Sequence, residues 1–255
     1  WSEARAITEP LQLENLTDGF YYVEVSGKKH VGMWDDDSRM GEAMYVAKSE
    51  VWEIRGSAPQ TEDCSLLLSE IDSQKGWVEL FNAGSEVVDL ANMSLTTNQQ
   101  LPGQFTFPAG TTLAPGEYLT VNVGTAGILS MEGGALYLMQ GTTVCDSVSY
   151  GVQVTGYTLG RMNESGWSLS TPTPGAANIG VLLGEKGGLR INEWLASEQS
   201  VSGGDFIELY NAGELPVALD SLCLSDALGE VGRMALPANS FIAAGGFAVF
   251  AADGM

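Results

Sequence analysis

Apolar and polar residues alternate along much of the chain in short runs that end at turn residues. Residues 77–84 read WVELFNAG, in which apolar and polar side chains precede an Asn-Ala-Gly turn. A period of two places every second side chain on the same face of a strand. No long run carries apolar residues at the helical period of about 3.6. The pattern therefore predicts an all-β protein.

The same run returns 129 positions later as FIELYNAG, at residues 206–213. The offset holds without a gap from residues 77–123 to residues 206–252. Turn residues recur at this offset, among them Pro108 and Pro237, and Gly116 and Gly245. Short strands with a turn signal about every ten residues indicate an antiparallel sandwich or barrel. A fixed offset indicates two copies of one unit.

The ordered set of segments resembles bacterial lamin-tail domains, which are immunoglobulin-like β-sandwiches. The resemblance rests on an opening strand, LLSEI at 67–71 and RINEW at 190–194, on the repeated strand above, and on the hairpin after it. The first copy closes with WSL and then TPTPGAAN, at 171–178. The resemblance covers most of 64–178, the first repeat, and again 189–255, the second repeat. It implies tandem immunoglobulin-like antiparallel β-sandwiches.

Three modules are expected. Residues 1–58 resemble the closing strands of a fibronectin-III or other immunoglobulin-like module, with strand signals at 20–27, 31–34 and 45–54. Residues 59–180 are expected to form a complete lamin-tail-like β-sandwich. Residues 181–255 are expected to form a second one that is truncated on its C-terminal side, so the chain is interpreted as an excerpt of a longer protein. Polar linkers are predicted at 58–63 and 179–188.

The chain is strongly acidic, with 32 Asp and Glu against 11 Lys and Arg and a formal net charge of −21. Such a surface repels phosphate backbones, so we expect no nucleic-acid partner, although eukaryotic members of the family are associated with the nuclear lamina and chromatin. No apolar run reaches transmembrane length, so no membrane insertion is expected. The start of the chain lacks a secretory pattern, and a signal peptide is expected outside this fragment.

Three cysteines are too few for a disulfide scaffold. Cys64 and Cys145 both lie in the first repeat and could form one bridge, but the pairing cannot be read from the sequence. The favoured interpretation is two small buried residues. Cys223 aligns with Ser94, so the repeat does not require it.

Two polar residues and a glycine recur in both copies and form a repeated signature: Glu79 and Glu208, Asn82 and Asn211, Gly84 and Gly213. One interpretation is a shared binding or metal site. The favoured interpretation is structural: a carboxylate and an amide that hold the turn through hydrogen bonds to the backbone.

Motifs of catalysis are absent from the sequence. His30 is the only histidine, and there is no nucleophile elbow, zinc-protease motif or pair of CxxC motifs. Asp35, Asp36 and Asp37 lack the spacing of an EF-hand loop. We therefore expect no enzyme, catalytic residue or cofactor, and Ca²⁺ is left open without a motif that indicates it.

Aromatic residues offer the remaining candidate chemistry. The tryptophans on predicted strands are mostly expected in the core: Trp34, Trp52, Trp77, Trp167 and Trp194. Tyr150 and Tyr157 flank a loop and are better placed to stack on a sugar.

The sequence-based hypothesis is a set of non-catalytic spacer or adhesion modules in a large secreted or surface bacterial protein. The alternative is an accessory carbohydrate-binding module of an extracellular degradative enzyme. Expected partners are other domains of the same chain and an extracellular protein or glycan.

Overall fold

The computed structural model describes residues 64–162, 166–195, 205–225 and 234–252, together with the backbone of four short strands nearer the N-terminus. The chain divides into two units. The first combines Trp1–Gly56 with Cys223–Ala235, and the second combines Ser57–Leu222 with Leu236–Met255. His30, Trp34, the three adjacent aspartates and the predicted linker at 58–63 lie outside the described residues, as does the predicted strand at 31–34.

Three small antiparallel ribbons make up the described part of the first unit. They are β1 (Gly19–Tyr21) with β4 (Trp52–Ile54), β2 (Glu24–Ser26) with β3 (Val46–Lys48), and β20 (Cys223–Leu224) with β21 (Met234–Ala235). The single strand predicted at 20–27 is therefore two strands with different partners. The module boundaries predicted near residues 58 and 180 remain predictions.

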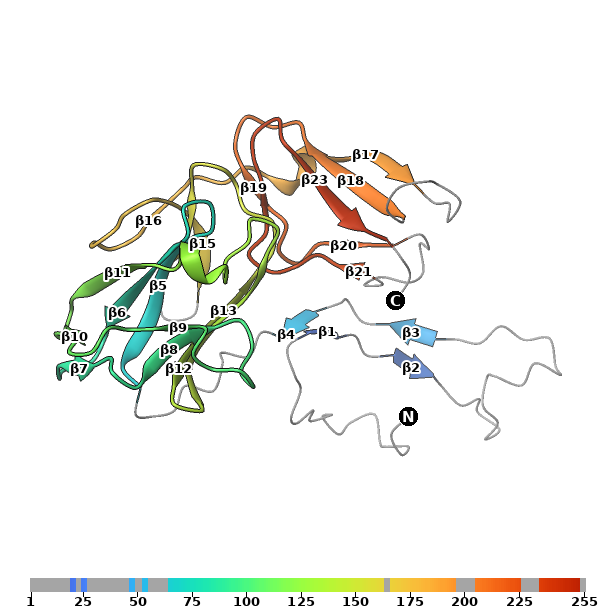
Figure 1. Ribbon diagram of the computed structural model, residues 1–255. Coiled ribbons are helices and arrows are strands. Elements are labelled where there is room, and N and C mark those ends of the chain that lie inside the picture. Colours follow the sequence, from blue (N-terminus) through green and yellow to red (C-terminus); the bar gives the residue numbers. More distant parts are fainter. Residues whose placement is uncertain are drawn as a thin grey trace, which may run out of the picture. The chain divides into compact units, whose positions relative to one another are not determined.

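The first repeat is built from two main antiparallel sheets (Figure 1). One has the order β11 (Tyr118–Asn122), β6 (Trp77–Asn82), β5 (Leu66–Asp72), β14 (Thr158–Arg161), β15 (Trp167–Thr171), β16 (Ile179–Gly180). The other has the order β13 (Thr143–Tyr150), β12 (Gly134–Gln140), β8 (Met93–Thr96), β9 (Phe105–Thr106). A ribbon of β7 (Val88–Asp89) with β10 (Thr112–Leu113) and the 3₁₀ turn η2 (Gly124–Ala126) complete it. The all-β class predicted from the sequence is confirmed.

The core of the first repeat lies between these sheets, because the inward side chains of both are aliphatic. Fully or almost fully buried members are Leu66, Leu68, Ile71, Val78 and Leu80 from the first sheet and Met93, Leu95, Leu136, Leu138 and Val148 from the second. Alternating strands that bury one face each against the other sheet form a β-sandwich. The fold is that of an immunoglobulin-like sandwich.

The second repeat pairs its strands in the register of the first. Its main sheet has the order β17 (Leu189–Leu195), β18 (Phe206–Asn211), β23 (Phe247–Ala251), and its small ribbon joins β19 (Val217–Ala218) to β22 (Phe241–Ile242). Leu209 opposes Ala248 as Leu80 opposes Leu119. The opening strands even share an irregularity, between Leu68 and Glu70 in β5 and between Ile191 and Glu193 in β17.

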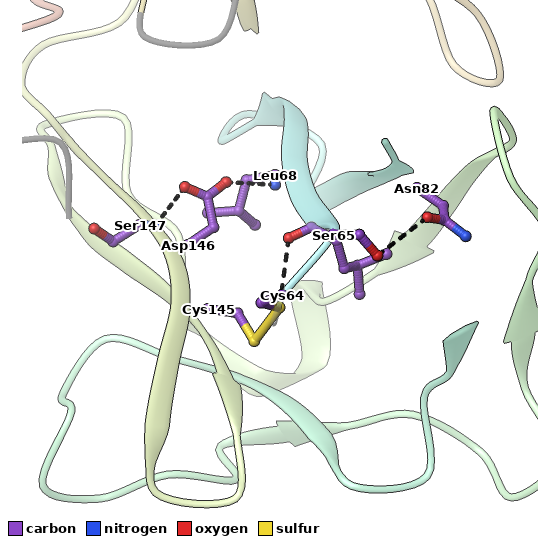
Figure 2. Close-up of a disulfide and its surroundings, with 8 residues drawn as sticks. Cys64, Ser65, Leu68, Asn82, Cys145, Asp146 and Ser147 are labelled. Carbon is purple, nitrogen blue, oxygen red and sulfur yellow. Dashed lines mark hydrogen bonds between the residues drawn. A yellow bond between two sulfur atoms is a disulfide. The ribbon is translucent and has the colours of Figure 1, made fainter. Parts of the chain in front are cut away.

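Cys64 and Cys145 form a disulfide, so the favoured interpretation as two separate small buried residues is wrong. Their Cα atoms lie 5.5 Å apart, although 81 positions separate them in the sequence. The bond ties Cys64, two residues before β5 of one sheet, to β13 in the other (Figure 2). Only the packing of the two sheets brings these cysteines together, which is why spacing along the chain could not reveal the bridge.

Backbone hydrogen bonds join the two repeats directly. The Gly151 N–H donates to the carbonyl of Ala238 at 3.0 Å, and the Phe241 N–H donates to the carbonyl of Val152 at 2.8 Å. The Phe241 side chain is 1% exposed and packs into the core cluster of the first repeat. In the first repeat this position is Thr112, which is exposed at the surface.

Two amide side chains strengthen the same junction. Asn239 has a φ of 53°, a left-handed conformation that asparagine tolerates better than most residues, and Gly110 occupies the equivalent position with a φ of 80°. Asn239 Nδ2 donates to the carbonyl of Ser149 at 2.8 Å, and Gln153 Nε2 donates to the carbonyl of Asn239 at 2.7 Å. The side chain that replaces the glycine therefore serves the contact between repeats.

The segment predicted as a linker at 179–188 is itself bonded to both repeats. The Val181 N–H donates to the carbonyl of Leu169 at 2.8 Å, and the Gly184 N–H donates to that of Pro216 at 2.8 Å. The 3₁₀ turn η3 (Lys186–Gly188) then leads into β17, and the Ala212 N–H donates to the carbonyl of Gly188. These bonds hold the segment at both ends.

Candidate functional site

Two glutamates lie side by side on the outer face of the first repeat's larger sheet. Glu70 of β5 opposes Glu79 of β6 in the ladder, on the side facing away from the core. Both are 0% exposed. Two neighbouring carboxylates without solvent need hydrogen-bond donors, because burying an unpaired charge is costly.

Half of those donor groups come from the segment that begins at the last residue of β15. We call residues 171–178 the closing segment. The Thr173 N–H donates to both oxygens of Glu70 at 3.1 Å, and Thr173 Oγ1 donates to Oε2 at 3.2 Å. The Gly175 N–H donates to Oε2 of Glu79. The closing segment thus covers the glutamate pair and is anchored by it.

The sheet itself supplies the remaining donors. Thr158 Oγ1 donates to Oε1 of Glu70. Thr120 Oγ1 donates to Oε2 of Glu79 at 2.9 Å, and Ser69 Oγ donates to Oε1 at 3.3 Å. Burial raises the pKa of Glu70, and the hydrogen bonds from Thr158 and Thr173 oppose that rise.

The end of the closing segment is held by Asn178. Its Nδ2 donates to the carbonyls of Ser69 at 2.9 Å and Arg161 at 3.0 Å. A Cβ atom at Gly160 would lie 2.9 Å from Cγ of Asn178, so this position in β14 admits only glycine without rearrangement.

The second repeat has the same glutamate pair in an open environment. Glu193 opposes Glu208 across β17 and β18, after the same irregularity. Asn192 Nδ2 donates to Oε1 of Glu208 at 2.6 Å, in the place that Ser69 takes in the first repeat. Val249 replaces Thr120 and has no hydroxyl to donate. Glu193 is exposed, and among the described residues no segment covers the pair.

The repeated asparagines hold the turn after β6 and β18. Asn82 Nδ2 donates to the carbonyls of Glu86 at 2.8 Å and Leu113 at 2.9 Å, while the Gly84 N–H donates to Asn82 Oδ1 at 2.9 Å. Asn211 repeats this set with Leu215, Ile242 and Gly213, and its Nδ2 also lies 3.0 Å from the carbonyl of Ala243. Glu79 and Glu208 do not take part in the turn. Holding the turn through hydrogen bonds to the backbone therefore accounts for the repeated asparagines but not for the repeated glutamates.

A buried ion pair connects the two sheets next to the disulfide. Asp146 Oδ2 accepts from the Leu68 N–H at 2.8 Å and from Arg161 Nη2, and Arg161 Nε donates to the Leu68 carbonyl at 2.7 Å (Figure 2 shows the Asp146 side). Burial raises the pKa of Asp146, and the Arg161 guanidinium and the Leu68 N–H oppose it. The Arg161 guanidinium also lies over the Trp167 ring, 4.6 Å from its centroid.

The tyrosines proposed to stack on sugars are not both accessible. Tyr150 is 5% exposed at the end of β13 and belongs to the core, with its hydroxyl accepting from the Ser130 N–H. Its ring therefore presents no face to a ligand. Tyr157 is half-buried against the same core. Trp194, expected in the core, is 70% exposed, whereas Trp77 and Trp167 are half-buried. The side chain of Trp52 is not described.

The described residues contain no group of three His, Cys, Asp or Glu side chains that could hold a metal ion. They also contain no helix long and apolar enough to cross a membrane. The glutamate pair of the first repeat is saturated with donors from its own chain, so its chemistry is the anchoring of a peptide segment.

Sequence reasoning did not single out Glu70 or the closing segment as a site. The signal was present, because Glu70 and Glu193 both occur in the repeated opening strand and two prolines flank Thr173. Nothing local, however, joins these positions, which are about a hundred residues apart.

Comparison with known families gives one match. Residues 59–152 match the family model of the Lamin Tail Domain, an immunoglobulin-like and generally non-catalytic domain. This part of the chain, from β5 to the end of β13, is therefore similar to lamin-tail domains. The match stops before β14 and the closing segment. No curated protein and no solved structure matches the chain.

Proposed function

We propose that the chain is a non-catalytic part of a large secreted or surface bacterial protein, in which tandem lamin-tail-like sandwiches act as spacer or adhesion modules. The observation that carries the proposal is the junction between the repeats. A spacer must hold its modules at a fixed distance and orientation, and backbone hydrogen bonds with a shared core residue, Phe241, provide such a connection.

A fixed junction is testable by NMR on the intact chain in a weakly aligning medium. The amides of β5 to β15 and those of β17, β18 and β23 are expected to fit one alignment tensor, because the repeats then tumble as one body. Two separate tensors would show that the repeats reorient independently, which would rule out a rigid spacer.

The disulfide supports the extracellular part of the proposal. Disulfides persist in oxidising compartments and are rare in the reducing cytosol. The test is thiol labelling of the protein isolated from its native cells under denaturing conditions. Cys64 and Cys145 are expected to be protected until reduction, and Cys223, which is a free thiol, to react at once. Labelling of all three cysteines before reduction would contradict secretion.

Carbohydrate binding remains the alternative function, although the buried ring of Tyr150 cannot stack on a sugar. A polysaccharide and glycan array with the intact chain checks it. Saturable binding that is lost on Tyr157→Ala would favour the alternative over the spacer. The absence of binding by the folded chain would leave the spacer or adhesion proposal in place.

A further inference from the structure

The disulfide of the first repeat closes a long loop of the chain. Cys64 and Cys145 are 81 positions apart, and the loop between them contains β5 to β12. The bond holds the two ends of this loop together, with their Cα atoms 5.5 Å apart. Without the bond, the loop could be pulled out to about 280 Å, at roughly 3.5 Å for each residue. The bond therefore withholds this length whenever the chain is pulled.

The start of β13 is attached to the first half of β5 in two ways. A bulge makes Cys145 an extra residue of β13, which no residue of β12 opposes, and Cys145 and Asp146 are both buried although they are consecutive. Cys145 forms the disulfide with Cys64, and Asp146 accepts from the Leu68 N–H at 2.8 Å (Figure 2). A covalent bond and a hydrogen bond therefore join these two parts of the sandwich.

The other end of β13 leads directly to the second repeat. The Gly151 N–H donates to the carbonyl of Ala238 at 3.0 Å, and the Phe241 N–H donates to the carbonyl of Val152 at 2.8 Å. Only the residues from Cys145 to Gly151 therefore separate the disulfide from the hydrogen bonds between the repeats. A β-strand is already close to the full length of its chain, because it rises about 3.3 Å per residue against a limit of about 3.6 Å. This connection has little length to give under load.

The covalent route between the repeats is much longer. From Val152 the chain passes through β14, β15, the closing segment and residues 179–188 before β17 begins at Leu189. This route is folded back on the first repeat, because β14 pairs with both β5 and β15. It gains length under load as soon as those pairings open, whereas β13 does not. The short connection through β13 is therefore the stiffer one and takes the load first.

We propose that β13 is the tension-bearing strand of the first repeat. Pulling force that enters the repeat at Cys64 crosses the disulfide to Cys145, follows β13, and leaves through the hydrogen bonds of Gly151 and Val152 to the second repeat. The closed loop with β5 to β12 then carries little of the force. The inference rests on the proposed spacer function, because a chain is placed under tension where it links two separated bodies. It gives that spacer a fixed length under load.

Optical tweezers on the intact chain test this path. Handles are attached through azide-bearing residues in place of Glu62 and Glu214, which leaves the cysteines unmodified and puts the first repeat and the junction under load. Complete unfolding of the oxidised chain is expected to release about 28 nm less length than unfolding after reduction of the same tether. Equal lengths would mean that the disulfide does not withhold the loop and would overturn the proposal.

A matched pair of variants tests where the force leaves the repeat. Asn239→Gly removes the donor to the Ser149 carbonyl, and a glycine fits there, since Gly110 occupies the equivalent position with a left-handed φ. At constant force, the first extension step of the oxidised chain is expected about fivefold sooner in this variant, because that step is the opening of the junction. Gly110→Asn makes the reverse exchange at an exposed turn and is expected to leave the step unchanged. An unchanged step in Asn239→Gly would overturn the proposal.

The aligned NMR experiment separates this proposal from the spacer function. One alignment tensor together with an unchanged first step in Asn239→Gly would keep the rigid spacer and overturn the tension path. Two tensors together with a step that depends on Asn239 would support the tension path and rule out the rigid spacer. A first step that is equally early in Asn239→Gly and Gly110→Asn would show a general loss of stability and would also overturn the proposal.

Discussion

At the scale of single residues, Asn82 shows why the repeated turn needs an amide. Its side chain is fully buried, donates to two carbonyls and accepts from the Gly84 N–H. A carboxylate could not donate, and a hydroxyl has only one hydrogen. Asparagine is thus the short side chain that satisfies all three groups, and Asn211 does the same in the second repeat.

Replacement of Asn82 by alanine is expected to lower the free energy of unfolding by about 3 kcal/mol, because two buried carbonyls and one N–H lose their partner. Urea unfolding followed by tryptophan fluorescence measures the change. Asn122→Ala is a suitable control, since Asn122 is exposed and accepts only from the Gly124 N–H. A cost below about 1 kcal/mol for Asn82→Ala would show that water replaces these bonds.

Glu70 gives a prediction with a defined pH dependence. Burial raises the pKa of its carboxyl above the ordinary 4.5, so the folded state binds the proton more tightly than the unfolded state. The resulting stabilisation is full below the ordinary pKa and is lost as the pH rises through the raised value. Glu70→Gln removes this contribution. The stability of the native chain relative to Glu70→Gln is therefore expected to fall as the pH rises above 4.5.

The comparison with Glu70→Gln is needed because a chain with a net charge of −21 repels itself at high pH for other reasons. That repulsion affects the native chain and the variant almost equally and cancels in the difference. Urea midpoints between pH 4 and pH 7 provide the measurement. If the stability of the native chain relative to Glu70→Gln rose with pH, the hydrogen bonds to the carboxylate would outweigh the effect of burial on its pKa.

At the scale of elements, the closing segment converts an acidic sheet face into buried structure. Its effect depends on the conformation of Gly175, which has a φ of 83° while its N–H reaches Glu79. A residue with a Cβ atom is strained in that conformation by about 1–2 kcal/mol. Space is not the constraint, because nothing lies within 4 Å of a Cβ atom added there.

Gly175→Ala is therefore expected to cost about 1–2 kcal/mol of unfolding free energy through backbone strain alone. Gly187→Ala is the matched control, since an added Cβ atom there also meets nothing within 4 Å and its φ is not positive. Guanidinium unfolding compares the two. Equal effects would show that the φ of Gly175 is not a constraint on the closing segment.

At the scale of the whole molecule, the second unit holds parts of both repeats in one packed body. The repeats approach each other closely at Gly151, because an added Cβ atom would lie 2.0 Å from Oγ of Ser240 and 2.7 Å from Cβ of Pro237. The absence of a side chain at this position allows the backbone hydrogen bonds between Gly151 and Ala238 and between Val152 and Phe241.

Gly151→Ala is expected to lower the free energy of unfolding by about 1–3 kcal/mol, because overpacking forces the junction apart. In the aligned NMR experiment the repeats of this variant are expected to require two tensors. Gly134→Ala, at an open position of β12, is expected to keep the single tensor. A variant Gly151→Ala that keeps native stability and one tensor would show that the junction adapts without loss.

Much of the architecture could be predicted from the sequence, because strands and turns are local features. The period-two runs predicted β6 and β18, and the fixed offset predicted two copies of one unit, whose strand pairings share a register in the structure. Glycine and asparagine indicated the turns because both tolerate the backbone conformations of tight turns, which depend on only a few neighbouring residues. The prediction of one strand at 20–27 was wrong because the pattern of side chains does not indicate which strands pair, and β1 and β2 pair with different strands.

The features that could not be predicted all depend on which distant segments meet. The bridge of Cys64 with Cys145 joins the two sheets across 81 positions, and the Thr173 N–H reaches Glu70 across 103 positions. Tyr150 is buried because it packs into the core of the first repeat. Trp194 makes the same point in reverse. Trp194 occupies the same place in its strand pattern as the buried Ile71, yet its side chain is exposed. Whether a side chain is buried depends on what packs over the strand, and the pattern of the strand does not contain that information.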